Sequence, residues 1–132
     1  MTGPGEGRAG PTQPRLDPAT AEQLVSAYLA RHGATDLEGV VALFADEACL
    51  EDPVGSPSLQ GLKAIRSFYR ETHARNGPLV VERMGSVLVG GEEIAFHVNA
   101  RLARDPGARG MDVIYVVRVD RAGRICALRA WY

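Results

Sequence analysis

Residues 111–132, MDVIYVVRVDRAGRICALRAWY, decide the fold of this 132-residue chain. In 111–119 every second side chain is apolar, which is the period of a strand that buries one face. Asp120 to Gly123 has the composition of a tight turn, and 124–132 is again strand-like. The end of the chain is therefore predicted to be a β-hairpin.

Strand patterns also precede this hairpin. Residues 94–102, IAFHVNARL, alternate apolar and polar side chains in the same way. Shorter strands are expected at 48–51, 80–84 and 87–89. Because the later strands follow one another through short turns, they predict an antiparallel meander.

The first half of the chain has a different period. Apolar residues recur at helical spacing in 17–32, 37–44 and 62–75. Asp17 followed by Pro18 is typical of a helix start. Helices followed by antiparallel strands predict an α+β fold, with a curved antiparallel sheet wrapped around three helices and an apolar pocket between them.

The N-terminal residues 1–16 are rich in Gly and Pro and lack apolar periodicity. Such a segment buries too little apolar surface to offset its ordering entropy, so we expect a disordered tail followed by one domain over 17–132. The tail contains a GxGxxG from Gly5 to Gly10. A dinucleotide site needs a strand before this motif and a helix after it, and neither is expected here.

The composition excludes several classes of partner. The 15 basic and 16 acidic residues give a formal net charge of −1, without the basic excess of a general nucleic-acid binder. No apolar run approaches the roughly 18–20 residues of a membrane span, and the first residues lack the apolar core of a signal peptide. We therefore expect a cytoplasmic protein with no membrane or nucleic-acid partner.

The histidines show no spacing typical of metal ligands. His32 and His73 fall near predicted helix ends, where we expect solvated side chains, and His97 lies within a strand. No metal and no organic cofactor are expected.

The segment 50–55, LEDPVG, places two carboxylates at a strand end before a proline. Successive strand side chains point to opposite faces, so one of Glu51 and Asp52 is expected to face inward. An Asp before Pro is often only part of a turn. The alternative is a general base at the mouth of the pocket, with its pKa raised by apolar walls.

Together with 94–102 and 111–132, the stretch 27–71, which contains EDPVGSP, resembles the bacterial ketosteroid isomerases. These enzymes belong to the superfamily that includes nuclear transport factor 2 and the SnoaL-like proteins. The resemblance spans about Glu22 to Tyr132. It implies a cone-shaped fold around an apolar pocket.

The resemblance also implies residue roles. Asp52 would be the general base that moves a proton between two carbons of a β,γ-unsaturated ketone, through a dienolate. Tyr28 would donate a hydrogen bond to the oxyanion, and Tyr69 would support Tyr28. The substrate would be a small apolar ketone, steroid-like or polyketide-like. The pocket would be lined by Phe96, Val98, Ala100, Val113, Trp131 and Tyr132.

Two positions depart from the family pattern. The second oxyanion donor of the family is a protonated Asp, an established case of pKa tuning in these isomerases, whereas this chain has Tyr115. A third tyrosine of the family corresponds to Phe44, which has no hydroxyl. Tyr115 would either take over as the second donor, since a phenol also donates, or narrow the pocket for another substrate.

Other functions remain open on the same scaffold. The alternatives are an epoxide hydrolase/cyclase or a polyketide cyclase. Opening an epoxide would need a second carboxyl beside Asp52, and Glu82 and Asp112 are the candidates. Alternation puts Asp112 on the strand face opposite Tyr115. The chain could instead be a non-catalytic ligand-binding module. A homodimer is expected through the outer sheet face, with Ile114, Val116 and Leu128 in the interface.

Overall fold

The computed structural model describes residues 16–132, so the predictions for 1–15 lie outside the described range. It contains three helices, α2 (Pro18–Gly33), α3 (Leu37–Val41) and α4 (Leu62–Asn76). The α2 helix begins where the sequence predicts, because the Asp17 side chain accepts a hydrogen bond from the Thr20 N–H at 3.1 Å. Leu16 already packs against the core.

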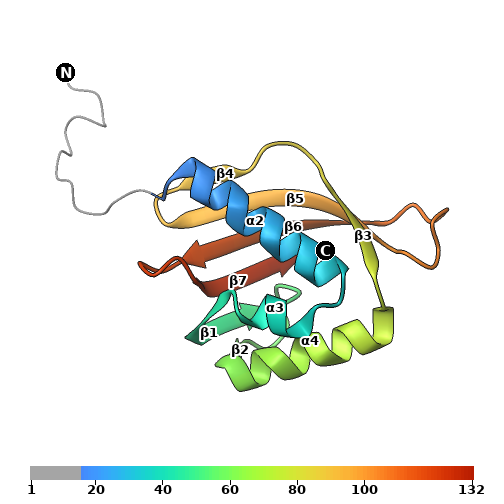
Figure 1. The fold of residues 1–132 in the computed structure, drawn as a ribbon, viewed down its shortest axis with the longest axis horizontal. Coiled ribbons are helices and arrows are strands. Elements are labelled where there is room, and N and C mark those ends of the chain that lie inside the picture. The colour runs from blue at the N-terminus through green and yellow to red at the C-terminus, as the bar shows by residue number, and fades with distance from the viewer. Residues whose placement is uncertain (1–15) are drawn as a thin grey trace.

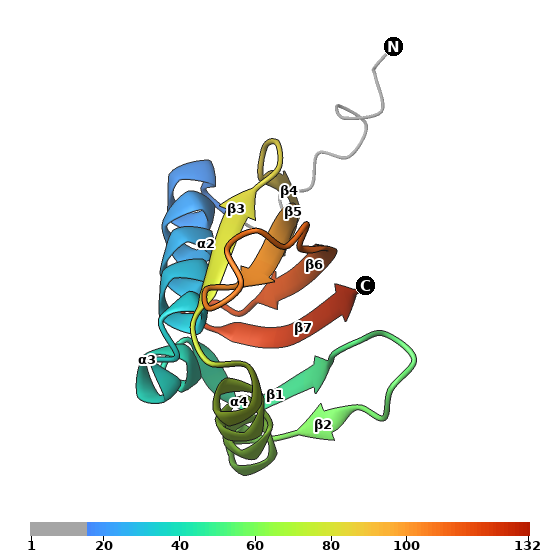
Figure 2. The ribbon, with the colours of Figure 1, turned by 90° about the vertical axis from the view of Figure 1, so that its right-hand side faces the viewer.

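In the described part of the chain, seven strands form one curved sheet beside these helices (Figures 1 and 2). Their order is β2-β1-β7-β6-β5-β3, and β4 pairs with β5. The α2 helix packs against β3, and α4 packs against β1 and β2. The strands are β1 (Phe44–Glu51), β2 (Leu59–Gln60), β3 (Leu79–Arg83), β4 (Leu88–Gly90), β5 (Glu93–Leu102), β6 (Met111–Val119) and β7 (Ile125–Trp131).

The predicted α+β class is confirmed, but the sheet is mixed rather than wholly antiparallel. β1 and β7 pair in parallel, with Leu50 opposite Leu128. Alternation along a strand carries no information on the direction of its neighbour, so the sequence could not supply this pairing. Phe44, expected at the end of the second helix, instead begins β1.

A one-residue irregularity in β7 sets which of its side chains face the core. Val119 pairs with Ile125, but the preceding Arg118 pairs with Ala127, so Cys126 is an extra residue in the ladder. An extra residue inverts the alternation beyond it. Leu128 is consequently buried, against the prediction that it lies on the outer face.

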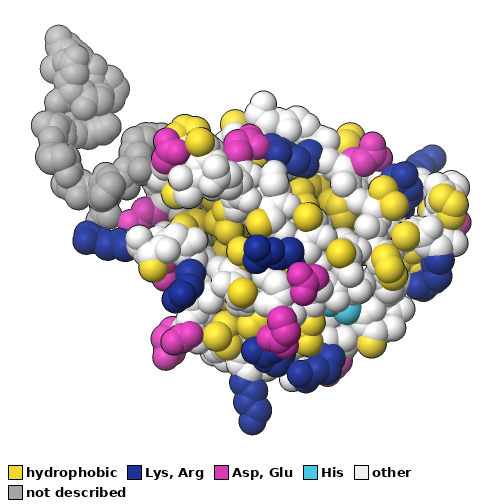
Figure 3. All heavy atoms as spheres, viewed as in Figure 1, with side chains coloured by type: hydrophobic (Ala, Val, Ile, Leu, Met, Phe, Trp, Pro, Cys, Tyr) yellow, Lys and Arg dark blue, Asp and Glu magenta, His cyan; other side chains and the backbone are white. Residues whose placement is uncertain are grey.

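Figure 3 shows basic and acidic side chains interspersed over the face that carries α2. Among the residues that the structure describes, this face has no continuous basic stripe. Within residues 16–132, no helix combines the length and apolar composition needed to cross a bilayer.

Candidate functional site

A cavity of about 410 Å³ lies between α4, the end of α2 and the inner face of the sheet. It brings together side chains from both halves of the chain, among them the carboxylate of Asp52 and the phenol of Tyr115. The lining residues are His32, Asp52, Pro53, Phe68, Thr72, Arg75, Asn76, Ala100, Met111, Val113, Tyr115 and Tyr132.

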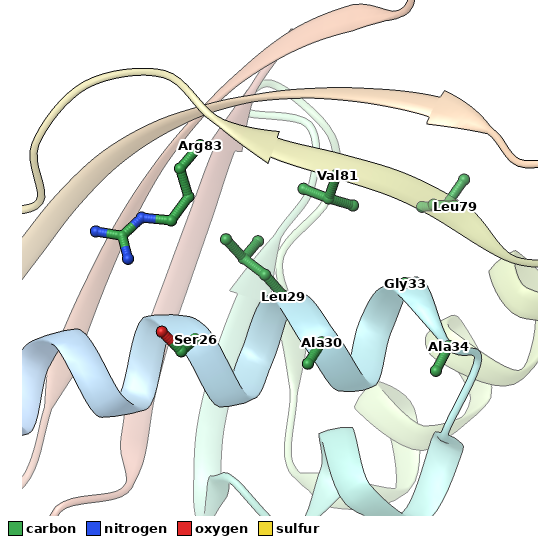
Figure 4. A pocket seen from close by; sticks show the side chains of 8 residues that line it. All are labelled: Ser26, Leu29, Ala30, Gly33, Ala34, Leu79, Val81 and Arg83. Atoms are coloured by element: carbon green, nitrogen blue, oxygen red, sulfur yellow. The ribbon is translucent and has the colours of Figure 1, made fainter. Parts of the chain in front are cut away.

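A second hollow, of about 510 Å³, runs between α2 and β3 (Figure 4). Its lining is mainly aliphatic, with Leu29 and Val81 between the two elements. Arg83 is its one charged lining residue, and its guanidinium is paired with Glu22 at 2.8 Å. This groove therefore lacks an acid or a base for catalysis, and the cavity beside α4 is the candidate site.

Asp52 follows β1 directly and is the carboxylate that faces this cavity. Its neighbour Glu51 points away and bonds to Arg129 Nε at 2.9 Å and to the Gly55 N–H at 3.1 Å. Burial raises the pKa of Asp52 above its ordinary value, and the Tyr132 hydroxyl offsets only part of this rise. The two carboxylates therefore have different roles. Glu51 orders the loop, whereas Asp52 faces the cavity, where a ligand can reach it.

Three buried tyrosines lie near Asp52. The Tyr28 and Tyr69 hydroxyl oxygens are 2.8 Å apart, and the Tyr115 ring meets Tyr28 edge-on with centroids 5.5 Å apart. Burial raises the pKa of Tyr28, Tyr69 and Tyr115 above that of a free phenol, and the nearby Asp52 charge adds to the rise for each. All three phenols consequently stay protonated and able to donate hydrogen bonds.

The tyrosines differ in their access to the cavity. Tyr115 lines it, and its ring stacks on Phe96 with centroids 5.0 Å apart. Tyr28 is 2% exposed and does not belong to the lining. Tyr28 thus lies one layer deeper than Tyr115, although the resemblance gives it the principal role.

The predicted wall residues divide into two groups. Ala100, Val113 and Tyr132 line the cavity. Phe96 and Val98 do not: Val98 is in the closed core, and Phe96 lies beside Tyr115 as its partner on the neighbouring strand.

Trp131 also does not line the cavity. The extra residue in β7 turns it to the outer face, where the Arg129 guanidinium lies 4.9 Å from its ring centroid. The prediction for Trp131 fails for the same reason as that for Leu128.

Neither candidate for a second carboxyl reaches the cavity. Glu82 is exposed and bonds to Arg101 at 3.1 Å, and Asp112 is exposed and bonds to His97 at 3.1 Å. Within residues 16–132, no cluster of three or more His, Cys, Asp or Glu side chains is arranged to hold a metal ion.

The sequence reasoning missed a histidine pair in the site. His32 was expected in solvent but is 8% exposed and lines the cavity, with its Nδ1 3.1 Å from His73 Nε2. Helical spacing could have revealed it, because His32 follows Tyr28 by four residues and His73 follows Tyr69 by four, which puts each pair on one helix face. Burial lowers the pKa of His32 to about 4, and the nearby His73 adds to this effect.

Comparisons with known proteins agree with this architecture. The chain is 29% identical over 118 residues to a steroid delta-isomerase of Nocardioides simplex, covering 86% of this chain and 90% of that protein. Its fold matches a SnoaL-like protein of unknown function from Burkholderia thailandensis with a TM-score of 0.76 at 21% identity, covering 90% of this chain and 98% of that one. The model of the SnoaL-like domain family matches residues 25–128. On this evidence, the chain belongs to the SnoaL-like domain family.

Proposed function

We propose that this protein is a steroid delta-isomerase-like enzyme, which moves a C=C bond into conjugation with a ketone. The observation that carries the proposal is Asp52, the one carboxylate among residues 16–132 that lines the cavity, together with a protonated phenol, Tyr115, in the same lining. Similarity to the isomerase of Nocardioides simplex supports this assignment. The substrate class is a small apolar ketone, steroid-like or polyketide-like.

The reaction needs only one base. Asp52 removes a proton from the carbon between the ketone and the double bond, and the electron pair moves onto the ketone oxygen to give a dienolate. The resulting carboxylic acid then returns the same proton to the γ-carbon. No net oxidation occurs, and Asp52 ends the cycle ionised. The raised pKa of Asp52 makes it a stronger base than an exposed carboxylate.

The tyrosines stabilise the charge on the dienolate oxygen. Tyr115 donates directly, because its side chain lines the cavity. Tyr28 supports this donation from the deeper layer, where its hydroxyl shares a hydrogen bond with the Tyr69 hydroxyl. In the transition state a fixed donor in a closed cavity stabilises developing charge more than water does.

A two-carboxyl mechanism is less well supported. Opening an epoxide needs one carboxyl to accept a proton and a second to supply one. Among residues 16–132, Asp52 is the one carboxylate in the cavity lining. The hydrolase/cyclase alternative therefore lacks its second acid.

The proposal is tested by incubating the protein with a β,γ-unsaturated steroid ketone and following the absorbance of the conjugated enone. We expect turnover without added metal or cofactor. A substrate deuterated at the α-carbon should carry part of its label to the γ-carbon, since one carboxyl removes and returns it. A folded protein that binds the ketone without turnover would instead be a binding module, and the isomerase proposal would be wrong.

The proposal includes a cytoplasmic homodimer that pairs through the outer sheet face. Ile114 and Trp131 lie opposite each other there and are 41% and 37% exposed. Burying such apolar side chains favours association. Ile114→Glu should convert a dimer into a monomer in sedimentation velocity, whereas Ala30→Glu, at an exposed apolar residue of α2 on the helix side of the sheet, should leave the dimer intact. A wild-type monomer at micromolar concentration would contradict this assembly.

A further inference from the structure

The His32–His73 pair is absent from the reaction scheme, yet one of its members, His32, lines the cavity. The ring of His32 stacks on Tyr28 with centroids 5.5 Å apart and meets Tyr69 edge-on at 5.4 Å. It therefore has a fixed orientation, and its burial makes a neutral ring the stable form.

The hydrogen-bond partners of the pair indicate where its protons lie. His73 Nδ1 is sealed from solvent and has no partner among residues 16–132. A proton on that nitrogen would be an orphaned buried N–H, which proteins tolerate less well than an orphaned acceptor. The proton of His73 is therefore assigned to Nε2, which donates to His32 Nδ1 at 3.1 Å.

This assignment fixes His32 as well. A neutral imidazole that accepts at Nδ1 carries its proton on Nε2. Within the described residues, His32 Nε2 has no protein partner, and it is not one of the sealed, unpaired atoms. Since His32 lines the cavity, its Nε2–H is available to a ligand.

We propose that His32 is a specificity-determining residue whose Nε2–H donates a hydrogen bond to a second oxygen of the substrate, distinct from the ketone oxygen held by Tyr115. His32 and Tyr115 each pack against Tyr28 but come from α2 and β6, so they present donors from different walls. This inference rests on the proposed function for the identity of the first oxygen. His73 is a positioning residue that holds the His32 tautomer.

The cavity wall around His32 also carries other hydrogen-bond donors. Thr72, Arg75 and Asn76 lie on α4 and line the cavity beside His32, and each carries a hydrogen-bond donor. The facing wall of Ala100 and Val113 is apolar. The cavity thus fits a ketone with one apolar face and at least one further hydroxyl or carbonyl oxygen on the other, rather than a plain hydrocarbon ketone.

The first arm of the test reads the tautomers without a substrate. Long-range ¹H–¹⁵N spectra of the ligand-free protein at neutral pH should show His32 and His73 both neutral and both protonated at Nε2. In His73→Phe, His32 should lose this single tautomer and titrate at higher pH. A His32 protonated at Nδ1 in the wild type would overturn the proposal.

The second arm measures affinity for matched conjugated steroid enones, each pair differing in one hydroxyl or carbonyl oxygen. The wild type should prefer the oxygenated member of at least one pair by about 2- to 10-fold, the worth of one net hydrogen bond. His32→Phe should abolish that preference, His32→Gln should retain part of it through its amide N–H, and Phe68→Leu, at a wall residue without a donor, should keep it. An equal preference in wild type and His32→Phe would overturn the proposal.

These measurements do not require turnover. If the enones bind with a His32-dependent preference but no ketone is isomerised, the proposed function fails and the donor assignment stands. If isomerisation occurs but no such preference is found, the proposed function stands and the donor assignment of His32 fails. Circular dichroism on each variant separates loss of the hydrogen bond from loss of the fold.

Discussion

Replacing Asp52 with Asn should lower turnover of a β,γ-unsaturated steroid ketone by at least about 10²–10⁴-fold, the usual contribution of general acid–base catalysis. The amide has nearly the same shape as the carboxyl but cannot take the α-proton. Because Asp52 lines the cavity and is half-buried, the substitution removes a destabilised charge and should not weaken the fold. The rate is measured by enone absorbance, and the free energy of unfolding by urea denaturation.

The matched control is Asp112→Asn. This carboxyl is exposed, bonds to His97 on the outer face of the sheet, and lies outside the cavity. Its replacement makes the same chemical change and should alter turnover by less than about twofold, because exposed charged contacts outside the cavity contribute little. Equal losses in the two variants would show that Asp52 is not the base.

The pH dependence of kcat/KM in the wild type should reflect the ionisation of Asp52. The base works only when ionised. We therefore expect kcat/KM to be at its maximum above the pKa of Asp52 and to fall as the pH drops below it. Since burial raises that pKa, the fall should begin at a higher pH than for an exposed Asp. A rate that stays constant down to the ordinary Asp value of 3.8 would contradict this.

Replacing Tyr115 with Phe should lower kcat by about 10²–10³-fold, the usual cost of losing one oxyanion donor. The ring stays stacked on Phe96, so only the hydroxyl facing the cavity is lost. Tyr28→Phe should reduce kcat less than tenfold, because Tyr28 is outside the cavity lining. It should instead lower the free energy of unfolding by about 1–3 kcal/mol, since it leaves the buried Tyr69 hydroxyl without its partner.

Comparing the loss of kcat in Tyr115→Phe with that in Tyr28→Phe decides which tyrosine donates to the oxyanion. A larger loss in Tyr28→Phe would mean that the oxyanion reaches the deeper tyrosine, as the family resemblance implies. Unaltered turnover in Tyr115→Phe, with normal stability, would show that Tyr115 shapes the cavity rather than donating to the substrate. Both measurements use the assay proposed for the wild type.

Much of the candidate site could be predicted from the sequence because its signals are local. Alternation in 111–119 puts Tyr115 on the inner face, and the change of face between Glu51 and Asp52 leaves one of them inward. The paired spacings of Tyr28 with His32 and Tyr69 with His73 were also present in the sequence. Their meaning was missed because a residue near a helix end is usually solvated.

By itself, then, the sequence determined the helices, most of the strands and the inward face of each regular strand, since these depend on periods of 3.6 and 2 residues. The tertiary structure alone decided the parallel pairing of β1 with β7 and the extra residue in β7 that exchanged the expected places of Leu128 and Trp131. It alone placed Tyr115, rather than Tyr28, in the cavity lining. It also packed α4 against the end of α2, so that His73 contacts His32. The reason is that strand direction, register and burial depend on contacts between residues distant in the chain, which no local period encodes.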